Sequence, residues 1–273
     1  MLSAVVGDIV GSEYEFHPVK RTDFPAFGAN ARFTDDTVLT LAVADALVAG
    51  GRDEDKTRRA MVESIASAGE AYPFCGFGQR FFRWLLDGDR RPYGSLGNGS
   101  AMRVSPVAWA FDTFEEVETF ARISSAVTHD HPEGIRGACA VAAAIFCGRC
   151  GESKDFVRRF ITERYGYDLS FRIADIRPSY RHSERAQTSV PQAIAAFLES
   201  ESVEEAIRLA VSLGGDADTQ AAIAASVAQA FYGEPPQKGL CCEWDRLAWE
   251  RLDDPLREKL TRFEDWLRSS DGG

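Results

Sequence analysis

Long apolar runs, an excess of positive charge and low-complexity linkers are all missing from this sequence. No uninterrupted apolar stretch reaches the roughly 20 residues of a membrane-spanning helix, and Asp8 interrupts the N-terminal segment before a signal peptide could develop. The 31 Lys and Arg residues face 42 Asp and Glu residues, a net charge of −11, so the surface field opposes a large polyanion such as duplex DNA. We therefore expect a cytoplasmic globular protein with no membrane partner and no nucleic-acid partner.

Signals for β-strands are also scarce, whereas helical periodicity recurs along the chain. Asp36 can cap a helix whose apolar residues follow helical spacing and which ends at Gly50 and Gly51. Residues 165–189 are polar and predict a long loop. No composition break divides the chain, so we expect one all-α domain over residues 1–273. Further helices are predicted over 4–10, 54–68, 78–86, 114–126, 133–147, 153–165, 190–199, 203–213, 218–232 and 255–267.

Six cysteines raise the question of a metal or redox site. Cys147 and Cys150 have C-x-x-C spacing, and Cys241 and Cys242 are adjacent. A redox C-x-x-C motif opens a helix, where the helix dipole lowers the thiol pKa, but this one follows a small, apolar helical stretch. We therefore interpret the cysteines as reduced structural thiols.

Two acidic clusters each lie where a loop enters an Ala-rich helix. Capping explains one carboxylate per helix, but two adjacent carboxylates repel each other unless a cation neutralises them. Carboxylates and hydroxyls are ligands of hard ions such as Mg²⁺, Mn²⁺ or Ca²⁺. The clusters therefore form a shared metal site if the two helix entrances face each other, and ordinary caps if they do not. The residues concerned are Thr34, Asp35, Asp36, Asp216, Asp218 and Thr219.

A Gly-rich segment and two histidines complete the candidate residues. Gly97, Asn98, Gly99, Ser100, Ala101 and Met102 precede Arg103, and such a loop can wrap its N–H groups around phosphate oxygens or form a flexible turn. His129 and His131 lie just before a predicted helix. A histidine there either takes part in proton transfer and ligand orientation or caps the helix.

Five segments together resemble the ADP-ribosylglycohydrolase family, over about residues 4–233. The segments are Gly-Asp-Ile-Val-Gly-Ser-x-Tyr-Glu-Phe from Gly7, Phe-Thr-Asp-Asp-Thr from Phe33, Gly-Asn-Gly-Ser-Ala-Met-Arg-Val-Ser-Pro from Gly97, Val-Thr-His-Asp-His-Pro-Glu-Gly from Val127 and Ser-Leu-Gly-Gly-Asp-Ala-Asp-Thr from Ser212. The resemblance implies a compact, orthogonally packed all-helical domain with two Mg²⁺ or Mn²⁺ ions at the mouth of an ADP-ribose cleft. It implies that the six residues of the acidic clusters are the metal ligands.

The resemblance also implies roles for the other candidates. Glu15 matches an acidic residue assigned to general acid/base catalysis or substrate gating, although Glu13 lies two positions away and the sequence does not say which carboxylate faces the site. Residues Gly97 to Met102 would hold the diphosphate, and His129 would contact the adenosine-side ribose or phosphate.

The implied reaction is hydrolysis of the N- or O-glycosidic bond between ADP-ribose and a modified side chain, on a protein or a small ADP-ribose conjugate. This bond breaks through an oxocarbenium-like state, which carboxyl groups stabilise. Two alternatives remain open at this point. A non-catalytic ADP-ribose reader could keep the same cleft, and a metal-dependent phosphoesterase could use the same ions on the diphosphate.

Overall fold

The computed structural model describes residues 2–233 and 242–270, in which helices joined by turns and loops make up the fold and no residue forms a β-strand. The helices are α1 (Leu2–Ser12), α2 (Asp35–Gly50), α3 (Glu54–Ala71), α4 (Gln79–Leu86), α5 (Gly99–Met102), α6 (Ser105–Ala110), α7 (Phe114–Ala126), α8 (Pro132–Arg149), α9 (Lys154–Tyr165), α10 (Ile173–Ile176), α11 (Ala186–Glu199), α12 (Val203–Val211), α13 (Ala217–Tyr232), α14 (Cys242–Arg251) and α15 (Asp254–Ser270). The all-α prediction is confirmed. None of the described helices is both long and apolar enough to cross a membrane.

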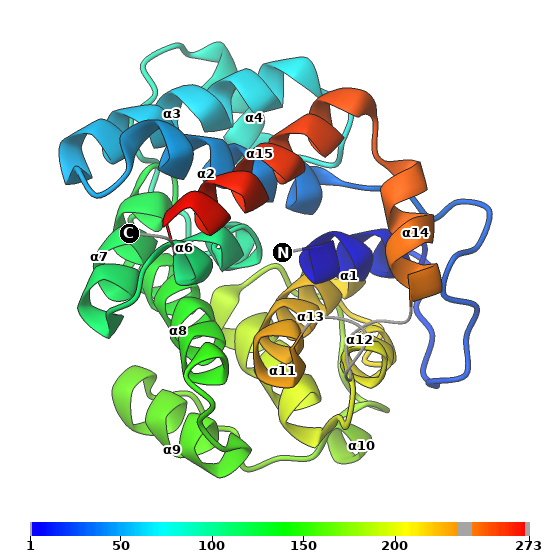
Figure 1. Ribbon diagram of the computed structural model, residues 1–273. Coiled ribbons are helices and arrows are strands. Elements are labelled where there is room, and N and C mark those ends of the chain that lie inside the picture. Colours follow the sequence, from blue (N-terminus) through cyan, green and yellow to red (C-terminus); the bar gives the residue numbers. More distant parts are fainter. Residues whose placement is uncertain (1, 234–241, 271–273) are drawn as a thin grey trace.

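Helix α13 forms the centre of the fold, and α1, α8, α11 and α12 pack around it (Figure 1). All of its residues from Ala217 to Ala230 are buried, as the many small side chains of this helix predict. Helices α2, α3 and α15 pack together in the upper part of the view, and α9 lies at the lower edge. The buried apolar side chains from α1 to α15 form one contiguous cluster.

Two glycines allow α1 to approach α13 closely. A Cβ atom added at Gly7 would lie 2.4 Å from the backbone oxygen of Ala221, and one added at Gly11 would lie 2.4 Å from both Ala217 O and Asp218 Cα. No side chain fits in these spaces, so glycine is required by packing rather than by an unusual backbone conformation. The contact brings Asp8 on α1 to the same end of the core as Asp218 on α13.

The structure corrects several expected boundaries. The predicted 165–189 loop contains the short helix α10. Helix α11 begins at Ala186, before the predicted start at 190, and includes Pro191 in its second turn, although a proline there removes one backbone donor. Helices α5, α6 and α14 were not predicted. Thr34, not Asp36, is the N-cap of α2, and its side chain accepts a hydrogen bond from the Asp36 N–H at 3.3 Å.

The cysteine interpretation agrees with the structure where it can be compared. Cys139 and Cys147 are buried free thiols whose pKa burial raises to about 12, and Cys150 is free and exposed at the C-terminal end of α8. Thiols with raised pKa values are poor nucleophiles, in contrast to those of a redox motif. Cys241 and the side chain of Cys242 lie outside the described residues.

Candidate active site

A cavity of about 640 Å³ lies where the N-terminal ends of α2 and α13 meet the C-terminal end of α1. Every residue predicted as a metal ligand lines it: Thr34, Asp35, Asp36, Asp216, Asp218 and Thr219. The two acidic clusters, about 180 positions apart in the sequence, therefore share one site. This arrangement satisfies the condition under which the clusters form a joint metal site.

Asp8 holds the start of α2 in place. Its carboxylate accepts hydrogen bonds from the Thr34 N–H at 2.9 Å, the Thr34 hydroxyl at 2.7 Å and the Thr37 N–H at 3.1 Å, and from the Thr37 hydroxyl. Two otherwise unpaired backbone donors in the first turn of α2 are thereby satisfied. Asp8 thus fixes the positions of Asp35 and Asp36, which follow Thr34.

At the start of α13, the side chain of the N-cap residue does not cap the helix. Asp216 occupies the N-cap position, but its side chain makes no capping hydrogen bond and accepts from Asn98 Nδ2 at 2.7 Å instead. The Thr219 hydroxyl donates to Asp36 Oδ2 at 3.1 Å and so links the two clusters. Asp218 Oδ1 accepts from the Thr219 N–H at 2.9 Å in the first turn of α13, but Asp216 caps nothing and Thr34 is the residue that caps α2, so the ordinary-cap interpretation does not account for all of the carboxylates.

The electrostatics of the cluster are unfavourable without a cation. Burial raises the pKa of Asp36 and Asp218 well above its usual range, and neighbouring carboxylates raise it further. Burial, followed by the charge of Asp218, also raises the pKa of Asp35 well above its usual range. Burial raises the pKa of Asp216 to about 7. Several buried like charges of this kind are normally neutralised by protons or by cations.

The donor set fits a hard divalent cation. Carboxylate oxygens of Asp8, Asp36 and Asp218 lie within 4.8 Å of one another, and so do those of Glu15, Asp216 and Asp218. Asp36 Oδ1 is buried and has no hydrogen-bond partner among the described residues. Asp218 belongs to both groups, whereas Asp35 lines the cavity outside them. Oxygen donors of this type suit Mg²⁺ or Mn²⁺ rather than softer metals.

The structure distinguishes the two glutamates that the sequence left open. Glu15 lines the cavity, and burial followed by the charge of Asp218 raises its pKa to about 8. The Glu13 carboxylate lies against Gly28, where an added Cβ would be 2.0 Å from Oε2, and Glu13 does not line the cavity. Next to Glu15, the Phe16 ring is 72% exposed and stacks on His182 at 6.5 Å, at the edge of the cavity.

The Gly-rich segment contributes only in part to the cavity. Gly97, Asn98, Gly99 and Met102 line it, whereas Ser100 donates to Gly134 O at 2.9 Å and Ala101 is buried in the core. Residues Gly99 to Met102 form α5, not an open loop.

The two histidines have different positions. His129 lines the cavity, with its Nε2 3.1 Å from the place where a Cβ at Gly99 would be. Burial, followed by the charge of Arg103, lowers the pKa of His129 well below its usual range, so the ring is neutral. His131 instead caps α8, where its Nδ1 accepts from the Glu133 N–H at 3.1 Å.

Two buried residues of the site were not assigned a role from the sequence. Asp8 occurs in the first motif, and a carboxylate inside an otherwise apolar helix was the available signal. Arg103 is fully buried, and its Nη2 donates to Ser124 O at 3.0 Å and Thr128 Oγ1 at 2.9 Å. Its position in the wall of the cavity depends on the packing of α5 on α8, which no local pattern encodes.

Comparison with known proteins agrees with this geometry. The sequence model of the ADP-ribosylglycohydrolase family matches residues 1–268. The chain belongs to the ADP-ribosylglycohydrolase family. Human ADP-ribosylhydrolase ARH3 is 27% identical over 310 aligned positions, which cover 85% of this chain and 84% of that protein. The ADP-ribosylarginine hydrolase Tri1 of Pseudomonas putida is 26% identical over 285 aligned positions, which cover 95% of this chain and 76% of that protein.

The fold is shared with a solved structure as well. A protein described as an ADP-ribosylglycohydrolase-related protein complex matches with a TM-score of 0.65 and 26% identity, over 90% of this chain and 93% of that one. The all-α fold of the ADP-ribosylglycohydrolase type is therefore confirmed, and family membership supports a glycohydrolase activity on ADP-ribose conjugates.

Proposed function

We propose that the chain is a metal-dependent hydrolase that cleaves the glycosidic bond between ADP-ribose and a modified protein side chain, and releases ADP-ribose. The observation that carries the proposal is the convergence of Asp36, Asp218, Asp216 and Glu15 on one cavity. The hydrolase names of the relatives support the same reaction class. An ADP-ribosylated protein or a small ADP-ribose conjugate is the proposed substrate, in the cytoplasm and without a membrane or nucleic-acid partner.

Two Mg²⁺ or Mn²⁺ ions are the proposed cofactors. The carboxylates of Asp35, Asp36, Asp216 and Asp218, with the hydroxyls of Thr34 and Thr219, would hold them. Cations bound there would grip the ribose hydroxyls and lower the pKa of a water molecule. Asn98 and Asp8 are positioning residues in this scheme, because they hydrogen-bond Asp216 and Thr34 respectively.

Glu15 is the proposed group for proton transfer. In the reaction, water adds to the anomeric carbon and gives up a proton, the bond from that carbon to the leaving atom breaks with its electron pair on that atom, and the leaving atom takes up a proton. A carboxyl with a raised pKa can hold such a proton near neutral pH. Glu15 faces both Asp216 and Asp218, so it is placed beside the carboxylates that would organise the ribose.

The diphosphate is proposed to lie along Gly97, Asn98 and Gly99, with the neutral His129 ring below them. A neutral imidazole can donate to or accept from a ribose hydroxyl or phosphate oxygen. The fully buried Arg103 also lines this part of the cavity and supplies positive charge near the proposed phosphates. Local neutralisation of this kind lets a protein of net charge −11 accept an anionic substrate.

A panel of ADP-ribosylated substrates tests the proposal. Peptides carrying ADP-ribosyl-arginine or ADP-ribosyl-serine are incubated with the protein and Mg²⁺, and in parallel with EDTA, and the products are identified by mass. Free ADP-ribose that forms only with Mg²⁺ is the expected result. Binding without product would instead identify an ADP-ribose reader, and AMP with ribose 5-phosphate left on the peptide would identify a phosphoesterase.

A further inference from the structure

His129 is hydrogen-bonded at one of its two ring nitrogens and not at the other. Its Nδ1 lies 2.7 Å from the hydroxyl oxygen of Thr128, in the segment between α7 and α8. Its Nε2 makes no hydrogen bond to the described residues and lies at the cavity wall, 3.1 Å and 3.6 Å from the places of a Cβ at Gly99 and at Gly97. Because the ring is neutral, one nitrogen carries a proton and can donate, while the other can accept. The bond at Nδ1 decides which of the two faces the cavity.

Arg103 is the first of two donors to the Thr128 hydroxyl. Its Nη2 donates to Thr128 Oγ1 at 2.9 Å and to Ser124 O at 3.0 Å, and a guanidinium has no acceptor atom. Its Nε and Nη1 are buried and have no partner among the described residues, so these two bonds hold the guanidinium. A hydroxyl oxygen can accept two hydrogen bonds and donate one. Arg103 therefore occupies one of the two acceptor positions of Thr128.

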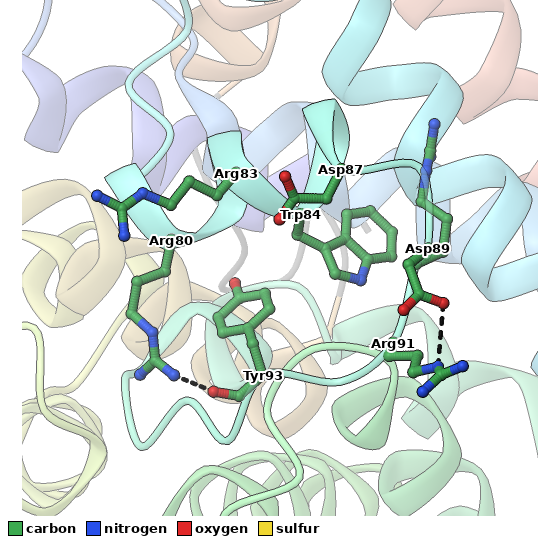
Figure 2. A pocket seen from close by; sticks show the side chains of 8 residues that line it. Arg80, Arg83, Trp84, Asp87, Asp89, Arg91 and Tyr93 are labelled. Carbon is green, nitrogen blue, oxygen red and sulfur yellow. Dashed lines mark hydrogen bonds and ion pairs between the residues drawn. The ribbon is translucent and has the colours of Figure 1, made fainter.

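Tyr93 is the second donor. Its hydroxyl is hydrogen-bonded to the Thr128 side chain, and burial raises the pKa of Tyr93, so the phenol keeps its proton. The described residues offer this phenol no other hydrogen-bond acceptor, so its O–H donates to Thr128. The backbone holds the two residues together, because the N–H groups of Tyr93 and Ser95 both donate to Thr128 O at 3.4 Å. Arg80 also fixes Tyr93, since its guanidinium donates to the Tyr93 backbone oxygen and lies 5.0 Å from the ring centre (Figure 2).

Two donors thus fill both acceptor positions of the Thr128 hydroxyl, and its own proton is left for His129 Nδ1. A ring nitrogen that accepts a hydrogen bond carries no proton, so the proton of the neutral ring lies on Nε2. We propose that Thr128 is a positioning residue that holds His129 in the Nε2–H tautomer, so that the ring presents a hydrogen-bond donor to the cavity.

A fixed donor at this position favours a ligand group that only accepts. Phosphate oxygens are acceptors, whereas a ribose hydroxyl carries a proton that needs an acceptor of its own. We therefore assign the Nε2–H of His129 to the diphosphate of ADP-ribose, beside Gly97 and Gly99. This assignment rests on the proposed function, because it takes ADP-ribose as the ligand. The tautomer of His129 in the free protein does not depend on it.

The first experiment reads the tautomer directly, by NMR of protein labelled with ¹⁵N in its histidines, near neutral pH and without ligand. The two nitrogens of a neutral imidazole resonate far apart, and couplings to the ring protons show which of them carries the proton. We expect the proton of His129 on Nε2, with its signals assigned by their loss in His129→Gln. His131 is an internal reference, because its Nδ1 accepts from the Glu133 N–H at 3.1 Å and so requires the same tautomer in the neutral ring.

Thr128→Val removes the hydroxyl and keeps a branched side chain of similar size. We expect it to shift His129 away from the pure Nε2–H tautomer and to weaken ADP-ribose binding in Mg²⁺ by roughly tenfold, because a charge-assisted contact is lost. Thr128→Ser retains the hydroxyl and should restore both the tautomer and the affinity. Ser125→Ala is the matched control, since the buried Ser125 hydroxyl donates to the backbone oxygen of His129 at 3.0 Å and does not touch the ring. It should leave both measurements unchanged.

A proton on Nδ1 of His129 in the wild-type protein would overturn the proposal, whether or not the variants fold. A Thr128→Val protein with the tautomer and the ADP-ribose affinity of wild type would also overturn it. ADP should move the Nε2 signal of His129 and adenosine should not; equal shifts would overturn the assignment to the diphosphate. The expected tautomer in a protein that binds no ADP-ribose would support the role of Thr128 and contradict the proposed function.

Discussion

Replacing Gly11 by alanine tests how strongly the contact between α1 and α13 determines the candidate site. The new Cβ would lie 2.4 Å from Ala217 O and from Asp218 Cα, closer than van der Waals contact allows. Both of these are backbone atoms, so one helix must move relative to the other. The shift would displace Asp218, which belongs to both groups of converging carboxylates.

The expected loss of stability follows from two opposing effects. Alanine in a helix is favoured over glycine by about 1 kcal/mol, whereas overpacking of a close-packed interior typically costs about 1–3 kcal/mol or more. Because the neighbouring atoms are backbone, we expect overpacking to outweigh the helix preference of alanine, with a net loss of up to about 2 kcal/mol. Urea unfolding measures this loss, and calorimetric titration with Mn²⁺ measures cation affinity.

Gly7→Ala is the matched variant. It creates the same kind of clash one turn earlier, against the backbone of Ala221 and Ala222, which carry no site side chain. Both variants should lose stability, but Gly11→Ala should lose more cation affinity than Gly7→Ala. A Gly11→Ala protein that is as stable as wild type and binds Mn²⁺ equally well would refute the reasoning.

Other substitutions test single groups of the site. Asp218→Ala should weaken cation binding by roughly 100-fold or more and abolish turnover. The thermal unfolding midpoint of Asp218→Ala in EDTA should not fall much, since the substitution removes one of several buried carboxylates that repel one another. A large fall would count against the electrostatic account. Glu15→Gln should lower the hydrolysis rate by about 10²- to 10⁴-fold, as expected for loss of a proton-transfer group, whereas Glu13→Gln should leave the rate near wild type. Equal effects of the two glutamate variants in a steady-state assay would contradict the assignment of Glu15.

Helix periodicity predicted the outer helices because core-facing residues recur regularly in them, as in α7, α9 and α12, whereas α8 and α13 are buried on most sides and are marked by their many small side chains. The short helices α5 and α6 were missed because four to six residues are too few to display a period. The predicted start of α11, at 190, was too late because of Pro191, since a proline more often begins or ends a helix than lies within one. Helix α14, at Cys242–Arg251, has few apolar residues at helical spacing.

The candidate metal ligands could be predicted because adjacent carboxylates at two helix entrances have no ordinary structural explanation. Their convergence could not be predicted from the residues alone, since it depends on the glycine-mediated contact of α1 with α13 and on the bonds from Asp8 to Thr34 and Thr37. Which of the two side chains, Glu13 or Glu15, faces the cavity likewise depends on where the chain turns after α1.

The most direct test of the central claim is the anomalous scattering from crystals of the protein grown with Mn²⁺. The account predicts two peaks about 4 Å apart, as in two-metal hydrolytic sites, among the carboxylates of Asp36, Asp216 and Asp218. Crystals that diffract well, contain Mn²⁺ and show no peak within coordination distance of these side chains would contradict it.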